Sequence, residues 1–242
     1  MEDPEARVGA ALGAVEDDGA NGPWVEGYGI VSPEVVRYAE VLRETPGAIE
    51  LAMRNVARSE GIDVIDEDAA TLLMLHARAL HPRRVLEVGT GIGLLTLHLA
   101  RAVPEDCTIT SIEADPLRQA QAHAFLERET FECAAELRLG DAIGLLHGGE
   151  SRGEFDMVVL SDPQVPRLGI LDEVAGRVAT GGLLVVPFAL RGGRVAVNEH
   201  VWNGDAMVEQ QRLLNRRIAM DARFVDVVLL PVGDGLLLAR RR

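Results

Sequence analysis

The sequence contains no lysine. All 24 of its basic residues are arginine, against 38 aspartates and glutamates, and its formal net charge is −14. A chain without lysine cannot form a P-loop, a lysine Schiff base or a lysine general base. The acidic excess also disfavours broad binding to nucleic acids, because their phosphates would be repelled. We therefore expect a partner other than a nucleic acid.

Cysteines, aromatic residues and long apolar runs are also scarce. Cys107 and Cys133 are the two cysteines and lack the spacing of a metal site, so we expect reduced, structural thiols. No apolar run approaches the roughly 20 residues of a membrane-spanning helix, and the acidic N-terminus resembles no signal peptide. We therefore expect a cytoplasmic protein without a membrane partner. Aromatics make up 4% of the chain and hydrophobic residues 48%, which predicts an aliphatic core.

The first segment, residues 1–28, is acidic, rich in glycine and alanine, and shows no hydrophobic period. This composition is typical of a disordered tail, although the segment could instead pack on a partner subunit. We place a single domain at residues 29–242. Its first part predicts three helices, at about 33–45, 48–59 and 66–80. In the third helix we expect Leu72, Leu73 and Leu75 to be buried.

From Arg84 onward, short apolar segments alternate with helical patterns. The predicted strands are 85–88, 107–112, 136–139, 155–160 and 183–186, the predicted helices 94–103, 116–131, 168–178 and 206–219, and the closing hairpin 224–230 with 235–239. Gly181-Gly182 is expected to form a turn. Alternation of strands and helices predicts a doubly wound α/β fold with a parallel sheet, and the hairpin adds an antiparallel strand at one edge.

A glycine loop, residues 89–93, follows the first strand. A dinucleotide-binding G-x-G-x-x-G loop would need a third glycine where Leu94 stands, so that fingerprint fails. Glu87, at the end of the preceding strand, would repel a pyrophosphate. Its carboxylate suits an ammonium group or a water network, as in the methionine part of S-adenosylmethionine (SAM).

Acidic residues also follow the next two strands. Glu113 ends the second strand, where a carboxylate can accept hydrogen bonds from both ribose hydroxyls. Gly140-Asp141-Ala142 follows the third strand, where the edge of an adenine would lie. Together with the glycine loop, these residues predict a nucleoside cofactor. In the alternative interpretation the loop is only a tight turn and Glu113 a solvated acid.

Several motifs resemble the catechol and caffeoyl-CoA O-methyltransferase family of class I SAM-dependent enzymes. They are Val85-Leu86-Glu87-Val88-Gly89-Thr90, Ser111-Ile112-Glu113, Leu139-Gly140-Asp141-Ala142, Phe155-Asp156, Gly181-Gly182 and Leu230-Pro231-Val232-Gly233-Asp234-Gly235-Leu236. The resemblance implies a Rossmann-like seven-stranded sheet of order 3-2-1-4-5-7-6, with N-terminal helices, and a homodimer. The cofactor contacts that it implies are Glu87, Gly89, Gly91, Glu113, Ala114, Asp141 and Ala142. We add Thr90, Gly93 and Ser161 to this predicted cofactor-binding set.

The family's catalytic pattern is interrupted in this chain. The resemblance implies a divalent cation, usually Mg²⁺, but Ser161 stands where the first aspartate ligand is expected and Asp162 comes one place late. Gln164 stands in place of the lysine base, and Pro187-Phe188 in place of an Asp-Asn ligand pair. We therefore predict no metal ligands and expect the usual metal site to be absent. The family's Tyr-Ser pair at the methionine end of the cofactor is Leu94-Leu95 here.

Two residues are catalytic candidates. Asp162 could act as a base or replace the first ligand, or it could cap the turn before Pro163. His200 lies after the fifth strand, where a substrate lid would sit, and could be a base or an ordinary surface residue.

Three functions are compatible with these residues. The first is a SAM-dependent O-methyltransferase of a small-molecule acceptor, independent of metal or with an altered metal site. The second is a non-catalytic protein that binds SAM or S-adenosylhomocysteine (SAH) and acts as a regulator or assembly partner. The third is a tRNA wobble-uridine methyltransferase, against which the net charge of −14 counts.

Overall fold

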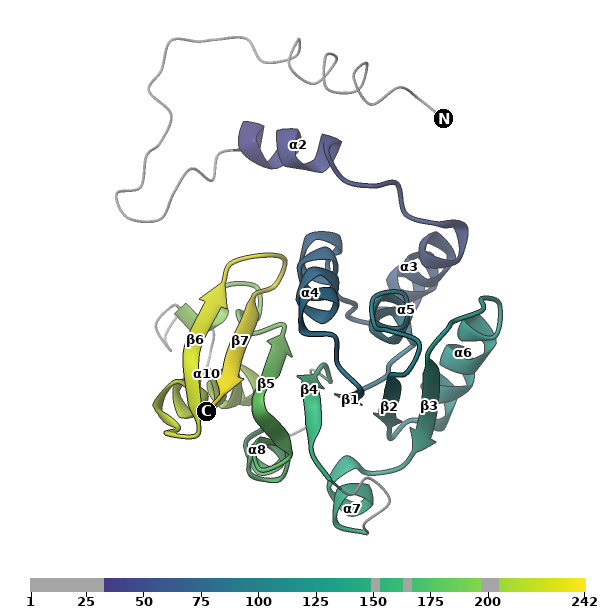
Figure 1. Ribbon diagram of the computed structural model, residues 1–242. Coiled ribbons are helices and arrows are strands. Elements are labelled where there is room, and N and C mark those ends of the chain that lie inside the picture. The colour runs from purple at the N-terminus through teal and green to yellow at the C-terminus, as the bar shows by residue number, and fades with distance from the viewer. Residues whose placement is uncertain (1–32, 149–152, 163–166, 197–204) are drawn as a thin grey trace, which may run out of the picture. The chain divides into compact units, whose positions relative to one another are not determined.

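The computed structural model describes residues 33–148, 153–162, 167–196 and 205–242 (Figure 1). The chain divides into two compact units, Met1–Gly47 and Ala48–Arg242. Helix α2 (Pro33–Val41) belongs to the first unit and agrees with the first predicted helix. The predicted tail, residues 1–28, lies outside the described residues.

The second unit contains a seven-stranded sheet of order β3-β2-β1-β4-β5-β7-β6 (Figure 1). Its strands are β1 (Arg84–Val88), β2 (Thr108–Glu113), β3 (Ala134–Leu139), β4 (Phe155–Leu160), β5 (Val178–Pro187), β6 (Phe224–Leu230) and β7 (Leu236–Arg241). β1 to β5 are parallel to their neighbours, whereas β7 is antiparallel to both β5 and β6. The predicted Rossmann-like topology is therefore confirmed.

Helices cover both faces of the sheet. They are α3 (Ala48–Glu60), α4 (Glu67–Leu80), α5 (Leu94–Ala100), α6 (Pro116–Leu126), α7 (Ala142–His147), α8 (Arg167–Ala175) and α10 (Ala206–Met220), with a 3-10 turn η1 (Arg194–Ala196). Alternate strand residues enter different cores, because successive side chains of a strand point to opposite faces. Val85 packs with α4 and α5, whereas Leu86 packs with α7, α8 and α10. Among the described helices, none combines the length and apolar character needed to cross a lipid bilayer.

The structure corrects two local predictions. Gly181-Gly182 is not a turn between elements but lies inside β5, opposite a register shift in β4. A Cβ on Gly182 would come within 2.8 Å of the Asp156 carbonyl oxygen, so the strand needs glycine there. Leu75 is 56% exposed, whereas Leu73 is buried. Two residues of a helix separated by one position lie on nearly opposite sides, so both cannot face the sheet. Helix α7 had no counterpart in the sequence prediction.

The chain reverses its direction of progress across the sheet between β1 and β4, which are neighbours. In open α/β sheets, ligands bind outside the carboxyl ends of the strands at such a switch point. The glycine loop, Glu113 and Ser161 follow or end β1, β2 and β4, and the fold brings them to this one edge.

Candidate functional site

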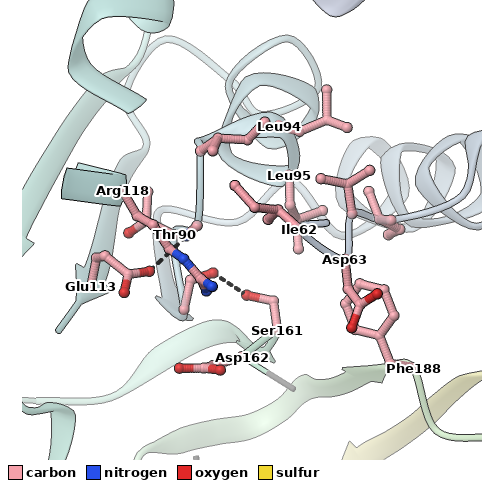
Figure 2. A pocket seen from close by; sticks show the side chains of 15 residues that line it. Ile62, Asp63, Thr90, Leu94, Leu95, Glu113, Arg118, Ser161, Asp162 and Phe188 are labelled. Atoms are coloured by element: carbon pink, nitrogen blue, oxygen red, sulfur yellow. Dashed lines mark hydrogen bonds between the residues drawn. The ribbon is translucent and has the colours of Figure 1, made fainter. Parts of the chain in front are cut away.

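A cavity lies at this edge (Figure 2). Its walls come from residues 89–92 of the glycine loop, the start of α5, residues 62–65 between α3 and α4, and the ends of β2, β4 and β5. In Figure 2, Glu113 and Arg118 lie toward one end, Asp63 and Phe188 toward the other, and Ser161 and Asp162 between them.

Hydrogen bonds hold the glycine loop against β2. The N–H groups of Gly89 and Thr90 donate to the Ile112 carbonyl oxygen at 2.8 and 3.2 Å. Gly89 has φ +94°, and a Cβ there would lie 2.4 Å from both the backbone N and the Cβ of Asp162. Gly91 has φ +54° and open space where a Cβ would stand. Glycine is thus required at position 89 by close packing, and at 91 it keeps the wall of the cavity free.

Glu113 is 4% exposed and lines the cavity. Its Oε2 accepts a hydrogen bond from the Gly91 N–H at 2.7 Å, and its Oε1 accepts one from the Asp115 N–H at 2.9 Å. Each carboxylate oxygen keeps a further lone pair. The carboxylate is thereby fixed in orientation and can still accept hydrogen bonds from a diol such as ribose.

Glu87 is fully buried beneath the loop and is not among the residues that line the cavity. Its Oε2 accepts hydrogen bonds from the hydroxyls of Thr96 at 2.6 Å and Ser111 at 2.7 Å, while its Oε1 has no partner among the described residues. Burial raises the pKa of Glu87 to about 7. The structure therefore gives Glu87 a position behind the loop, and its predicted contact with a cofactor ammonium stays a prediction.

Ser161 and Asp162 directly follow β4 and have different roles. The Ser161 hydroxyl lies 2.6 Å from the Gly89 carbonyl oxygen and 3.0 Å from that of Val88, to which it donates, so it holds the loop. Asp162 lines the cavity, and its N–H donates to the Val88 carbonyl oxygen at 3.0 Å. Asp162 thus stays a candidate base. His200 and Gln164 lie outside the described residues.

The remaining predicted cofactor residues are not among those that line this cavity. Asp141 caps α7, where its Oδ2 accepts a hydrogen bond from the Gly144 N–H at 2.7 Å. Ala142 is buried in the first turn of that helix, Gly93 precedes α5, and Ala114 is exposed. None of the four lines the cavity, and their contacts with a cofactor stay predictions.

The implied metal position does not fit a divalent cation. Hard cations prefer oxygen ligands, but Pro187 pairs with Leu236 in the sheet and Phe188 presents a hydrocarbon ring to the cavity. The Ser161 hydroxyl is directed at backbone carbonyls. Within the described ranges, no group of three or more histidines, cysteines, aspartates or glutamates could hold a metal ion.

Sequence reasoning missed several residues of the cavity. Asp63 and its neighbours lie in a connection between two helices, and Arg118 lies in the first turn of α6, so neither belongs to a recognisable motif.

Phe188 also lines the cavity, but the sequence analysis considered it only as a replacement for a metal ligand. It has φ +58°, which a bulky residue rarely adopts. Hydrogen bonds from the N–H groups of Ala189 and Leu190 to the β6–β7 turn follow it directly. The positive φ could not be predicted from sequence.

Comparisons with known proteins agree with this geometry. The O-methyltransferase family matches residues 46–242. Catechol O-methyltransferase domain-containing protein 1 of Mus musculus is 30% identical, over 82% of this chain and 75% of its own. Caffeoyl-CoA O-methyltransferase of Stellaria longipes is 27% identical, over 72% of this chain and 74% of its own.

Solved structures share the fold. The O-methyltransferase TomG of Streptomyces achromogenes, solved in complex with SAM, has a TM-score of 0.71 and 24% identity, with 86% of this chain and 95% of TomG covered. The family resemblance found in the sequence motifs is thus confirmed by an independent match over most of the chain. The chain belongs to the O-methyltransferase family.

Proposed function

We propose that this chain transfers the methyl group of SAM to a hydroxyl oxygen of a small-molecule acceptor, without the divalent cation that the motifs of its family imply. The observation that carries the proposal is the cavity at the carboxyl ends of β1, β2 and β4, where Glu113 and Asp162 face the same space. The relatives described above are named as O-methyltransferases, which gives no support to a non-catalytic regulator or a tRNA enzyme.

The lining residues fit the cofactor chemically. Glu113 would accept hydrogen bonds from the ribose hydroxyls, with its orientation held by the Gly91 and Asp115 N–H groups. Gly91 leaves room for the ligand beside the loop. When bound, SAM supplies a methyl group on a positively charged sulfur. The carboxylates of Asp63, Glu113 and Asp162 give the cavity a negative character that attracts this charge.

Asp162 is the proposed general base. Its carboxylate accepts the proton of the acceptor hydroxyl as the oxygen attacks, and later releases that proton to solvent. The packing of Gly89 against Asp162 fixes this residue next to the loop. The ring of Phe188 and the side chains of Ile62 and Val64 supply apolar surface that orients the acceptor and excludes water. Much of the rate then comes from positioning the two reactants.

We also propose that the enzyme is cytoplasmic and acts as a homodimer. The scarcity of cysteines supports a reducing compartment. The acidic surplus supports a small-molecule acceptor over a nucleic acid.

Calorimetric titration with SAH and turnover with a panel of phenols and catechols, each with and without EDTA, test this proposal. We expect SAH binding and turnover that EDTA does not reduce. Asp162→Asn should lower kcat by about 100-fold or more, because a positioned base typically contributes that much. Asp106→Asn, at a residue whose side chain is 62% exposed, is the matched control. Loss of turnover with EDTA would contradict the metal-free mechanism, and full activity of Asp162→Asn would exclude this base.

A further inference from the structure

The cavity contains one basic side chain among its described lining residues, Arg118. The other charged residues of the lining are Asp63, Glu113 and Asp162. Figure 2 shows the Arg118 side chain extending from α6 toward the middle of the cavity, on the side of Glu113 and Thr90. A single guanidinium among three carboxylates can select the orientation of a ligand that carries both signs of charge.

The packing of α6 explains why Arg118 reaches the cavity. Gly93 has φ +88°, and a Cβ there would lie 3.1 Å from the Ala122 Cβ, so glycine lets α6 approach the loop closely. Ala122 is fully buried. Arg118 precedes Ala122 by four positions and therefore lies on the same face of the helix, one turn closer to its start.

Arg118 is held only weakly by the protein. Its Nε lies 3.8 Å from the Asp115 Oδ2, beyond hydrogen-bond distance, and its side chain is 28% exposed. Asp115 itself caps α6, where its Oδ1 accepts a hydrogen bond from the Leu117 N–H at 2.8 Å. Across the described part of the chain, no hydrogen bond engages the guanidinium of Arg118, although this group carries five N–H donors.

Four backbone N–H groups of the loop are already engaged within the protein. The N–H groups of Gly89 and Thr90 donate to Ile112, that of Gly91 to Glu113 and that of Gly93 to the Thr90 carbonyl oxygen. Leu94 and Leu95, which also line the cavity, are hydrocarbon side chains. Among the described lining residues, Arg118 therefore offers the one positively charged donor to an anionic group that enters beside the loop.

This assignment rests on the function proposed above. SAM carries a sulfonium, an ammonium and one carboxylate, and the three acidic side chains of the cavity would attract the first two and repel the third. We propose that Arg118 binds the carboxylate of the methionine part of SAM. The planar fork of the guanidinium matches a carboxylate, so the pair favours ligands that carry this group over ligands that lack it.

A comparison of two ligands in calorimetric titration tests the assignment. SAH carries the carboxylate, whereas decarboxylated SAH keeps the ammonium and the adenosine. The wild-type protein should bind SAH about 10- to 100-fold more tightly than decarboxylated SAH, the range expected for hydrogen bonds to a charged group. Arg118→Gln should weaken SAH alone and bring the two affinities within about 3-fold, and Arg118→Lys should restore part of the difference.

Arg83→Gln is the matched control, because the Arg83 side chain is 82% exposed and does not line the cavity. Equal weakening of both ligands by Arg118→Gln would overturn the assignment, as would no weakening of either. If Arg118→Gln does not fold, Arg118→Lys gives the same comparison with a smaller change. A wild-type protein that binds neither ligand would refute the proposed function itself, so the two failures are distinguishable.

Discussion

Alanine in place of Gly89 tests whether the loop and Asp162 depend on each other. The new methyl group would lie 2.4 Å from the backbone N and the Cβ of Asp162, and the residue would keep φ +94°. A non-glycine residue in the left-handed region costs about 1–2 kcal/mol, and overpacking a tight contact about 1–3 kcal/mol. Since Asp162 contributes backbone atoms to the contact, rotation of a side chain cannot relieve it. We expect Gly89→Ala to lose about 2–5 kcal/mol of unfolding free energy.

Gly91→Ala is the matched variant. Gly91 also has positive φ, +54°, but a Cβ there would meet nothing within 4 Å. Only the cost of the positive φ remains, so we expect Gly91→Ala to lose about 1–2 kcal/mol of unfolding free energy. The methyl group would instead occupy space beside the cavity, so SAH affinity should fall by about 10-fold while the fold is retained.

Urea unfolding followed by circular dichroism measures both losses, and thermal melts check them. For a chain of this size about 1 kcal/mol corresponds to a shift in Tm of roughly 2–4 °C, so Gly89→Ala, with its loss of about 2–5 kcal/mol, should melt about 4–20 °C lower. Equal losses of stability in the two variants would refute the reasoning, because the contact with Asp162 distinguishes them. Wild-type stability of Gly89→Ala would show that the segment after β4 moves freely.

Two further predictions concern pH. Burial raises the pKa of Glu87 to about 7, so the folded state binds a proton more tightly than the unfolded state, and unfolding free energy should fall as pH rises from about 4.5 to 7, by about 3 kcal/mol. Glu87→Gln should flatten this decline in urea titrations between pH 4.5 and 8, and an unchanged slope would contradict it. Burial alone would raise the pKa of Glu50, but His98 and Arg54 lower it to about 2. The ionised Glu50 therefore contributes to the unfolding free energy above pH 4.5, and this contribution is lost as pH falls toward 2. Glu50→Gln should lower the unfolding free energy by about 2 kcal/mol at pH 7 and by less at pH 3, measured by the same urea titrations. A difference from wild type that grows on acidification would contradict this prediction.

Sequence reasoning predicted most of the fold because its signals are local. Alternation of apolar strands with helical periods predicted the doubly wound sheet, and the family resemblance implied the order of its strands, which the structure confirms. The bounds of β4 and β6 also agree with the prediction. Errors arose where the local pattern is ambiguous. Leu72, Leu73 and Leu75 are equally apolar, and only packing against the sheet determined that Leu75 faces outward. The sequence predicts a turn at Gly181-Gly182, whereas the pair lies inside β5. Glycine is needed there because neighbouring backbone carbonyl oxygens leave no room for a Cβ on Gly182.

The sequence alone predicted the alternation of strands and helices, the glycine loop and the place of Glu113, because hydrophobic period and loop composition are properties of short segments. The order of the strands was implied by the family resemblance. Tertiary structure alone decided which side chains share the cavity. Asp63, Arg118 and Phe188 come from three distant segments, and Glu87 faces the core beneath the loop. These features depend on the packing of helices against the sheet, which brings together residues whose separation in sequence carries no signal. The missing lysines excluded one base from the outset, and the folded chain places Asp162 and Arg118 in the cavity where the proposed chemistry needs a base and a cation.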